Sequence, residues 1–318
     1  MDGVRFHDER HFDSSSRDGA EEKVVNMNLG SVPRVTLNNG TTIPQLGFGT
    51  LAVQPDREAT PANIEMTAEI VRLALKAGYR HIDTAQSYGT ERGVGRAIAA
   101  SGIPRDQLYI TSKLANNNHQ PDDVRRSFDQ TLQYLGLEQL DLFLIHWPLP
   151  TLHDGDYVSA WRAVTEFVAE GRLRSAGVSN FQPAHLERII AETGAVPSVN
   201  QFEIHPYFAN STAQIASKRH GIAVEAHSPL GHKGAPLADE TITRIAITKG
   251  KSNAQVILRW HIQHGHIAIP KSVRAERMNE NINVFDFELS DEEIASIDTL
   301  DKGKGGRVGP NPDTYEGV

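Results

Sequence analysis

Four side chains with the chemistry to act on a carbonyl group stand at or just past the ends of short apolar runs. Residues 81–91, HIDTAQSYGTE, contain Asp83 and Tyr88 five positions apart, and two further apolar runs end on Lys113 and His146. A tyrosine phenol has a reference pKa of about 10, which makes it a poor proton donor near neutral pH. A neighbouring ammonium group stabilises the phenolate and lowers that pKa. The four residue types together predict a site that hands a proton to a carbonyl oxygen.

The other two members of the group complete this chemistry. Asp83 would hold Lys113 charged and in place, and His146 would donate a hydrogen bond that orients the carbonyl. Protein side chains supply no hydride, so the pattern implies a nicotinamide cofactor. Each residue also has an ordinary alternative: a helix cap, a solvated strand end, a buried core histidine or a surface tyrosine. Four such residues at one rim are a much less probable accident than any one alone.

The placement of these residues depends on eight short strand-like runs that alternate with longer amphipathic stretches. This alternation predicts parallel strands joined by right-handed crossovers, and eight units favour a closed (β/α)8 TIM barrel of the α/β class. An open doubly wound sheet is the alternative, but it usually carries a glycine-rich turn after its first strand, and LGFGT lacks one. Active sites of such barrels lie at the carboxyl ends of the strands. The predicted strands are 46–50, 79–83, 108–113, 140–146, 174–179, 198–203, 222–228 and 266–272.

Two further features support a barrel with an N-terminal β-hairpin. Alternating runs on either side of Asn39 and Gly40 predict the hairpin, because this dipeptide is a strong turn signal. Residues 67–78 and 121–136 have the apolar spacing of amphipathic helices, and each ends on a glycine placed like a C-cap.

The composition limits the classes of function. A formal net charge of −8 over 318 residues argues against a general nucleic-acid or acidic-membrane binder. The absence of cysteine removes disulfides and thiol chemistry, and no apolar run is long enough to span a membrane. Residues 1–30 lack the pattern of a secretory signal, so we expect a disordered extension there and one domain over residues 31–318. We expect a cytoplasmic monomer that binds neither nucleic acid nor membrane.

Three other motifs are weak. GVGRAIAA at 93–100 half-matches a dinucleotide-binding turn but does not follow a strand, and GKS at 250–252 lacks the first glycine of a P-loop. His261, His264 and His266 are close in sequence, yet no carboxylate joins them. We expect a polar helix-to-loop junction there and no metal site.

Seven motifs in order give the chain a specific resemblance. The stretches HIDTAQSYG, ITSKL, LDLFLIHWP, GVSNF, VNQFEIHP, SPLG and IPKSVRAERMNEN together resemble the aldo-keto reductase family. The resemblance covers roughly residues 33–313, and the C-terminal stretch is most similar to the bacterial 2,5-diketo-D-gluconic acid reductase branch. It implies an oxidoreductase that uses NADPH to reduce aldehydes, ketones or diketo sugar acids to alcohols.

The resemblance also implies a role for individual residues. Tyr88 would be the proton donor, tuned by Asp83 and Lys113, and His146 would orient the substrate, with Trp147 and Leu51 lining its pocket. The implied contacts to NADPH are Ser179, Asn180 and Gln201 at the nicotinamide carboxamide, His227 against its ring, Ser228 and Leu230 at the pyrophosphate, Lys271, Ser272, Val273, Arg274 and Arg277 at the 2′-phosphate and ribose, Glu280 and Asn281 at the adenine, and Ile269.

The last of these groups makes physical sense without the family. The spacing of Arg274, Arg277 and Asn281 predicts that all three share one helix face. Lys271 and Ser272 would then stand at the helix N-terminus, where the dipole and free N–H groups favour phosphate. Two arginines beside a lysine suit a dianionic 2′-phosphate, which favours NADPH over NADH. The alternative is a solvated basic helix face, which would need no Lys-Ser pair at its start.

Some positions depart from the better-known members of the family. His227 stands where an aromatic Tyr or Trp usually stacks on the nicotinamide, and an imidazole offers less area and can titrate. Leu51 and Ala115 replace pocket aromatics, so that Trp147 alone remains. Together with a short C-terminal tail, these changes predict an open substrate pocket that accepts polar, sugar-like carbonyls.

Two rival functions use the same residues differently. A non-catalytic aldo-keto-like module could bind nucleotide as a redox sensor, but such a binder has no use for a tuned phenol. A barrel hydrolase would need two facing carboxylates and a water, and Asp83 with Glu203 is the only obvious pair. Glu203 fits better as part of the NQFE motif of the reductases.

Overall fold

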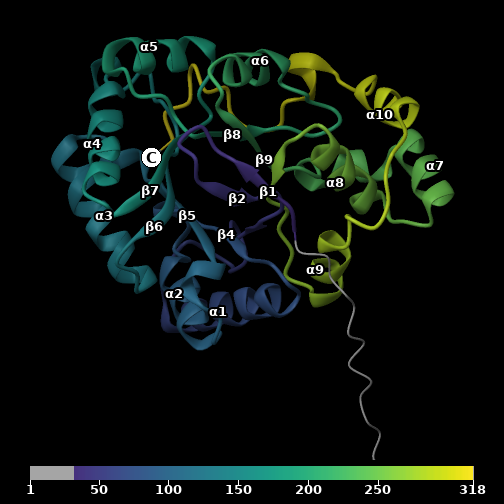
Figure 1. The fold of residues 1–318 in the computed structure, drawn as a ribbon, viewed down its shortest axis with the longest axis horizontal. Coiled ribbons are helices and arrows are strands. Elements are labelled where there is room, and N and C mark those ends of the chain that lie inside the picture. The colour runs from purple at the N-terminus through teal and green to yellow at the C-terminus, as the bar shows by residue number, and fades with distance from the viewer. Residues whose placement is uncertain (1–31, 318) are drawn as a thin grey trace, which may run out of the picture.

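The computed structural model describes residues 32–317 and confirms the predicted barrel (Figure 1). Its eight parallel strands pair in sequence order, from β3 (Phe48–Gly49) to β10 (Ile267–Ala268). Leu46 forms a parallel bridge to Ala268, and the Gly47 amide donates to the Ala268 carbonyl oxygen at 2.9 Å, so the two ends of the sheet meet. The strands between them are β4 (His81–Asp83), β5 (Tyr109–Leu114), β6 (Leu140–Ile145), β7 (Leu173–Ser179), β8 (Val199–Glu203) and β9 (Ala223–His227). The predicted extension at residues 1–30 lies outside the described residues.

The hairpin covers the end of the barrel where the strands begin. Strands β1 (Arg34–Thr36) and β2 (Thr42–Pro44) pair antiparallel, and Gly40 takes the left-handed conformation (φ 83°) that the turn requires. Figure 1 shows the hairpin in purple across the middle of the barrel. Its apolar side chains, Leu37 and Ile43, pack against residues near the start of the strands, such as Tyr109. The opposite end, where the strands finish, is left for a site.

Helices form a layer outside the barrel (Figure 1). A large buried cluster fills the space between them and the strands, including Val71 of the first helix, Trp161 of the fourth and Ile145 of β6. The helices are α1 (Pro61–Lys76), α2 (Glu91–Ala100), α3 (Pro121–Leu135), α4 (Val158–Ala169), α5 (Pro183–Thr193), α6 (Ser211–Arg219), α7 (Glu240–Lys249), α8 (Asn253–Gln263), α9 (Ala275–Ile282) and α10 (Asp291–Asp298).

Local sequence explains where these elements begin and end. The first helix starts earlier than predicted because Thr60 caps it, accepting a hydrogen bond from the Asn63 amide, and Pro61 follows at the first helical position. The predicted end of α3 at Gly136 is confirmed by its left-handed φ of 66°. The last strand ends at Ala268, short of the predicted 272, because Pro270 has no N–H to donate to the ladder.

The two nucleotide-like motifs have structural explanations. GVGRAIAA lies within α2, where Gly93 and Gly95 allow close approach of the neighbouring helices: a Cβ on Gly95 would lie 2.5 Å from the Tyr134 carbonyl oxygen. In GKS, Gly250 ends α7 in a left-handed conformation and Ser252 caps α8. Neither stretch forms a phosphate-binding turn after a strand.

Candidate active site

The four residues predicted to act on a carbonyl meet at the carboxyl ends of adjacent strands. Asp83 is the last residue of β4, and Lys113 is the second-last residue of β5. His146 directly follows β6, and Tyr88 ends the short 3₁₀ turn after β4 (Gln86–Tyr88). Because β4, β5 and β6 are neighbours in the sheet, the barrel brings the four side chains to one rim.

Lys113 and Asp83 form a buried ion pair. The Lys113 ammonium donates to the Asp83 carboxylate at 2.5 Å and to the Thr84 carbonyl oxygen at 3.0 Å. The lysine is completely buried, and the second Asp83 oxygen accepts from the Gln201 amide at 3.0 Å. Burial alone would lower the pKa of Lys113, but Asp83 and then Tyr88 raise it above its usual value. The lysine therefore stays charged although it is completely buried.

Tyr88 lies between this pair and His146. Its hydroxyl is 3.4 Å from His146 Nε2, and the two rings meet edge to face with centroids 5.6 Å apart. The Lys113 ammonium is 5.1 Å from the centre of the Tyr88 ring. Figure 1 shows β4, β5 and β6, the strands at whose ends these residues stand, side by side in the barrel wall. The phenol thus has an ammonium on one side and an imidazole on the other.

The direction in which the pKa of Tyr88 shifts differs from the sequence-based expectation. Burial raises the pKa of Tyr88 above that of a free phenol, and the Lys113 ammonium opposes this rise without reversing it. Burial, reinforced by Lys113, lowers the pKa of His146 well below its ordinary value. At neutral pH the site therefore holds a protonated phenol beside a neutral imidazole.

Two of the residues predicted to contact nicotinamide are tied to this group. Asn180 has a left-handed backbone (φ 63°), which lets its amide donate to the His146 carbonyl oxygen at 3.0 Å and to Ser179 Oγ at 3.1 Å. Gln201 is held by Asp83 as described above. Ser179, Asn180 and Gln201 are all buried at the strand ends that border the tetrad.

His227 is fixed by hydrogen bonds. Its Nε2 lies 3.1 Å from Asn180 Oδ1, so this nitrogen carries the proton, and its Nδ1 lies 3.3 Å from Ser228 Oγ. Burial lowers the pKa of His227 to about 4, although Glu203 opposes the shift. His227 is therefore a neutral imidazole at physiological pH. Beyond it, Ser228 is exposed, Leu230 is partly buried and Ile269 is buried.

The predicted phosphate-binding segment exposes three cations. Lys271, Arg274 and Arg277 are exposed, and none has a carboxylate oxygen within 4.0 Å among the described residues. Arg274 corrects the prediction of a shared helix face: its φ of −113° and ψ of 126° are extended, and α9 begins only after it. The Ser272 hydroxyl accepts the Arg274 amide at 3.1 Å and fixes this turn. Val273 is exposed, Glu280 is partly buried and Asn281 is buried.

Glu203 has a role that the sequence did not reveal. Its two carboxylate oxygens accept the amides of Val308 and Gly309, each at 2.8 Å, and His205 Nε2 lies 2.9 Å from the first of them. Burial would raise the pKa of Glu203, but these three hydrogen bonds lower it to about 2. The Glu203 carboxylate therefore anchors the C-terminal segment. It is not free to act with Asp83 as the carboxylate pair that the alternative hydrolase function would need.

The C-terminal segment continues from this anchor across the site. The Tyr315 ring packs on Trp147 with centroids 4.3 Å apart, and the Asn116 amide donates to the Gly317 carbonyl oxygen. The short tail thus packs against two of the loops that follow barrel strands, those that carry Asn116 and Trp147. Leu51 is 45% exposed. Tyr315 and Asn116 were missed because no spacing in the sequence links the tail to these loops.

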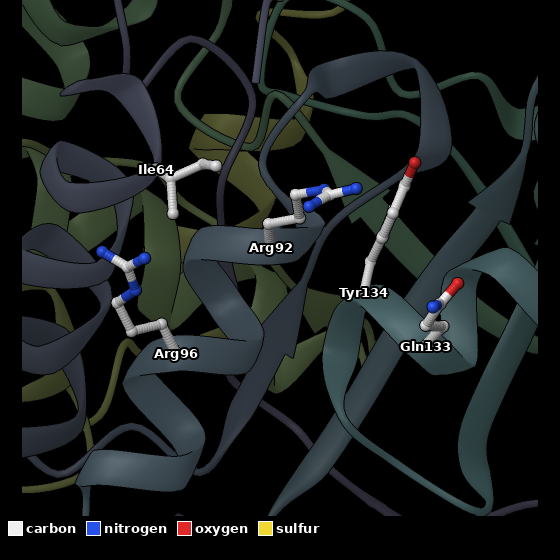
Figure 2. A pocket seen from close by; sticks show the side chains of 5 residues that line it. All are labelled: Ile64, Arg92, Arg96, Gln133 and Tyr134. Carbon is white, nitrogen blue, oxygen red and sulfur yellow. The ribbon is translucent and has the colours of Figure 1, made fainter. Parts of the chain in front are cut away.

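The three clustered histidines and the surface pocket of Figure 2 lie apart from this group. His261 Nε2 lies 3.0 Å from the Pro229 carbonyl oxygen, His264 Nε2 lies 3.0 Å from Asp298, and His266 Nε2 lies 2.9 Å from Gln214 Oε1. The three rings therefore serve as hydrogen-bonding partners within the helical layer.

The surface pocket, of about 320 Å³, contains none of the predicted site residues; Figure 2 shows that it is lined by Ile64, Arg92, Arg96, Gln133 and Tyr134.

Comparison with known proteins agrees with this geometry. A sequence model of the Aldo/keto reductase family matches residues 45–302. An aldo-keto reductase of Mycolicibacterium smegmatis is 49% identical over 283 residues, which are 89% of this chain and 98% of that protein. Glyoxal reductase of Bacillus subtilis is 44% identical over 279 residues, 88% of this chain and 96% of that protein.

A solved structure extends the comparison to the fold. The structure of a Gox0644 mutant in complex with NADPH matches with a TM-score of 0.82 and 40% identity, covering 89% of this chain and 98% of that one. Within residues 32–317, no helix is both long and apolar enough to cross a membrane. The matching family model, the relatives and the shared barrel lead to one conclusion: this chain belongs to the aldo/keto reductase family.

Proposed function

We propose that this protein is an NADPH-dependent carbonyl reductase in which Tyr88 donates the proton to the substrate oxygen. The observation that carries the proposal is the arrangement at the barrel rim, where a protonated phenol lies between a buried ammonium and a neutral imidazole. Burying the Lys113–Asp83 ion pair is costly, and a role in stabilising the Tyr88 phenolate accounts for its presence.

The mechanism follows from the protonation states. His146, whose pKa is lowered by burial, stays neutral and donates a hydrogen bond to the carbonyl oxygen, which polarises it. A reduced nicotinamide, when bound, would supply the hydride that side chains lack. As negative charge develops on the substrate oxygen, Tyr88 transfers its proton there, and the Lys113 ammonium stabilises the phenolate that remains. Lys113 need not ionise the phenol beforehand; it only has to stabilise the product of the proton transfer.

The residues present fit NADPH. Lys271, Arg274 and Arg277 are exposed cations without acidic partners in the described part of the chain, which suits a dianionic phosphate. The amides of Asn180 and Gln201 border the tetrad, where a nicotinamide carboxamide would lie. The Gox0644 structure holds NADPH in a barrel of the same fold, which supports the assignment. His227 would contact the ring as a neutral imidazole.

For the substrate we infer a small polar carbonyl compound, with diketo sugar acids as candidates. The Tyr315 ring of the tail covers one side of Trp147, and the glyoxal reductase relative acts on a small dicarbonyl, as its name states. We further infer that residues 31–318 work as a single barrel domain, as a monomer in the cytoplasm.

The test is the loss of NADPH absorbance by the purified protein with a panel of carbonyls. The panel contains glyoxal, methylglyoxal, a diketo sugar acid and a bulky aromatic ketone, and each is repeated with NADH. We expect turnover with NADPH, a preference for the small polar compounds and a much higher KM for NADH. Tight NADPH binding without turnover on any compound would instead favour the non-catalytic nucleotide-binding module.

A further inference from the structure

A second carboxyl group is sealed inside the barrel near the tetrad. Glu225 of β9 is completely buried, and neither of its carboxyl oxygens has a hydrogen-bond partner among residues 32–317. Buried polar groups are nearly always hydrogen-bonded, and an ionised carboxylate without a partner is especially costly. A group in this state needs an explanation, and none of the steps described above uses it.

The side chains around Glu225 connect it to the proton-donating group. Gln201, which holds Asp83, is its register partner across β8 and β9. His81 of β4 lies with Nε2 3.9 Å from Glu225 Oε1, and its Nδ1 also lacks a partner. On its other side Glu225 is in register with the apolar Ile267 of β10.

The charged and titratable groups that face Glu225 come from strands β4 and β5. These are Asp83 and His81 from β4 and Lys113 and Tyr109 from β5. Burial and then Asp83 raise the pKa of Glu225 to about 8, while Lys113 and the side-chain amide of Gln201, which lies outside hydrogen-bond distance, oppose the rise. Burial and Lys113 lower the pKa of His81 to about 3. Glu225 and His81 are therefore two neutral groups at neutral pH and not an ion pair.

We propose that Glu225 is a positioning residue of the reductase site that acts by keeping its proton. While Glu225 is protonated, the positive charge of Lys113 interacts with Asp83 and Tyr88 alone. This inference rests on the proposed reductase function. A neutral carboxyl adds no negative charge beneath Lys113, so the ammonium can stabilise the Tyr88 phenolate fully. Once Glu225 releases its proton to solvent, a second carboxylate competes for the same ammonium, and Tyr88 becomes a weaker acid.

The kinetic test is the pH profile of kcat with a good carbonyl substrate. Wild type should lose up to about tenfold in kcat between pH 7 and pH 9, because the protonated fraction of Glu225 falls from about nine in ten to about one in ten across its pKa of about 8. Glu225→Gln is neutral at every pH and similar in shape, so it should lack this inflection. The matched control is Glu91→Gln: Glu91 is also buried, but it lies on α2 and is bonded to Ser112 at 2.6 Å. The control should keep the wild-type inflection.

A second readout needs neither cofactor nor turnover. The infrared spectrum of wild type minus that of Glu225→Gln should contain the C=O stretching band of a protonated carboxyl at pH 7, and the band should disappear as pH rises through about 8. Absence of that band at pH 7, or an alkaline inflection that survives in Glu225→Gln, would overturn the proposal. Failure of the reductase function is seen separately, as wild-type protein that reduces no carbonyl while the band is present.

Discussion

At the scale of single residues, the site works through the different effects of burial on neighbouring groups. Burial raises the pKa of the Tyr88 phenol and lowers that of the His146 imidazole, so both are neutral at physiological pH. Lys113 resists the same burial because Asp83 is 2.5 Å away. An ammonium beside a neutral phenol and a neutral imidazole suits a proton donor, because the ammonium stabilises the phenolate once the proton has left.

The cofactor assignment gives a prediction for one arginine. Replacing Arg277 with Ala should raise KM for NADPH about 10- to 100-fold, because hydrogen bonds to charged groups contribute ~1.5–3 kcal/mol. KM for NADH should change by less than about twofold, since NADH lacks the phosphate that the arginine would bind. Steady-state kinetics with both cofactors measure the split. Arg244→Ala, which removes an exposed arginine of α7, is the control. An equal rise of both KM values would contradict the phosphate assignment.

The sequence predicted the tetrad because each member stands at or just past the end of an apolar run, and the order of these runs predicts a barrel. It did not predict the partners of Glu203 or Tyr315, because these lie about a hundred residues or more away along the chain. Glu225 could have been found: a glutamate within the apolar run IAVEAHS is itself a sign of an unusual buried group. The pKa direction of Tyr88 could not, since burial is a property of the folded state.

At the scale of elements, close contacts between helices hold the rim loops in place. Helix α2 follows the turn that carries Tyr88, and its Gly93 and Gly95 face α1 and α3 without side chains between them. In the sequence the same glycines looked like part of a nucleotide-binding motif. Their packing role depends on which helices become neighbours, and that is settled only by the tertiary fold.

Gly95→Ala should therefore destabilise the protein, although alanine favours helix. The new Cβ would lie 2.5 Å from the Tyr134 carbonyl oxygen, and relieving such overpacking typically costs about 1–3 kcal/mol. Denaturant unfolding measures the loss. Gly305→Ala is the matched control, because a Cβ there meets nothing within 4 Å. Unchanged or increased stability of Gly95→Ala would show that the helices are not in this close contact.

The anchor of the C-terminal segment predicts a pH dependence. Because the pKa of Glu203 is about 2 when folded, below the ordinary 4.5, its stabilising effect is fully present above about pH 4.5 and is lost as pH falls toward 2. Glu203→Gln should lower the free energy of unfolding at pH 7, and its difference from wild type should shrink at pH 3. Urea unfolding at both pH values measures this. Glu138→Gln, at an exposed glutamate without a partner in the described residues, should show neither effect. A difference that is the same at both pH values would contradict the assignment.

At the scale of the whole molecule, the barrel converts a linear order of motifs into one site. Lys113 is 30 residues from Asp83, and Gln201 is 118 residues from it, yet both bond to the same carboxylate. The eight strands and the hairpin could be predicted because each has a local signal, in apolar runs or in a turn dipeptide. The packing of the tail on Trp147 could not, because that segment has no regular structure beyond short turns and its partners are distant in the sequence.

The most direct test of the account is kcat for carbonyl reduction by Tyr88→Phe, measured beside wild type and Tyr134→Phe. Loss of the proton donor should lower kcat by about 10²- to 10⁴-fold, the usual contribution of general acid catalysis, while the Kd for NADPH changes by less than about twofold. Tyr134, on α3, should tolerate the same change. If Tyr88→Phe keeps more than about a tenth of wild-type kcat, Tyr88 is not the proton donor and the central claim is wrong.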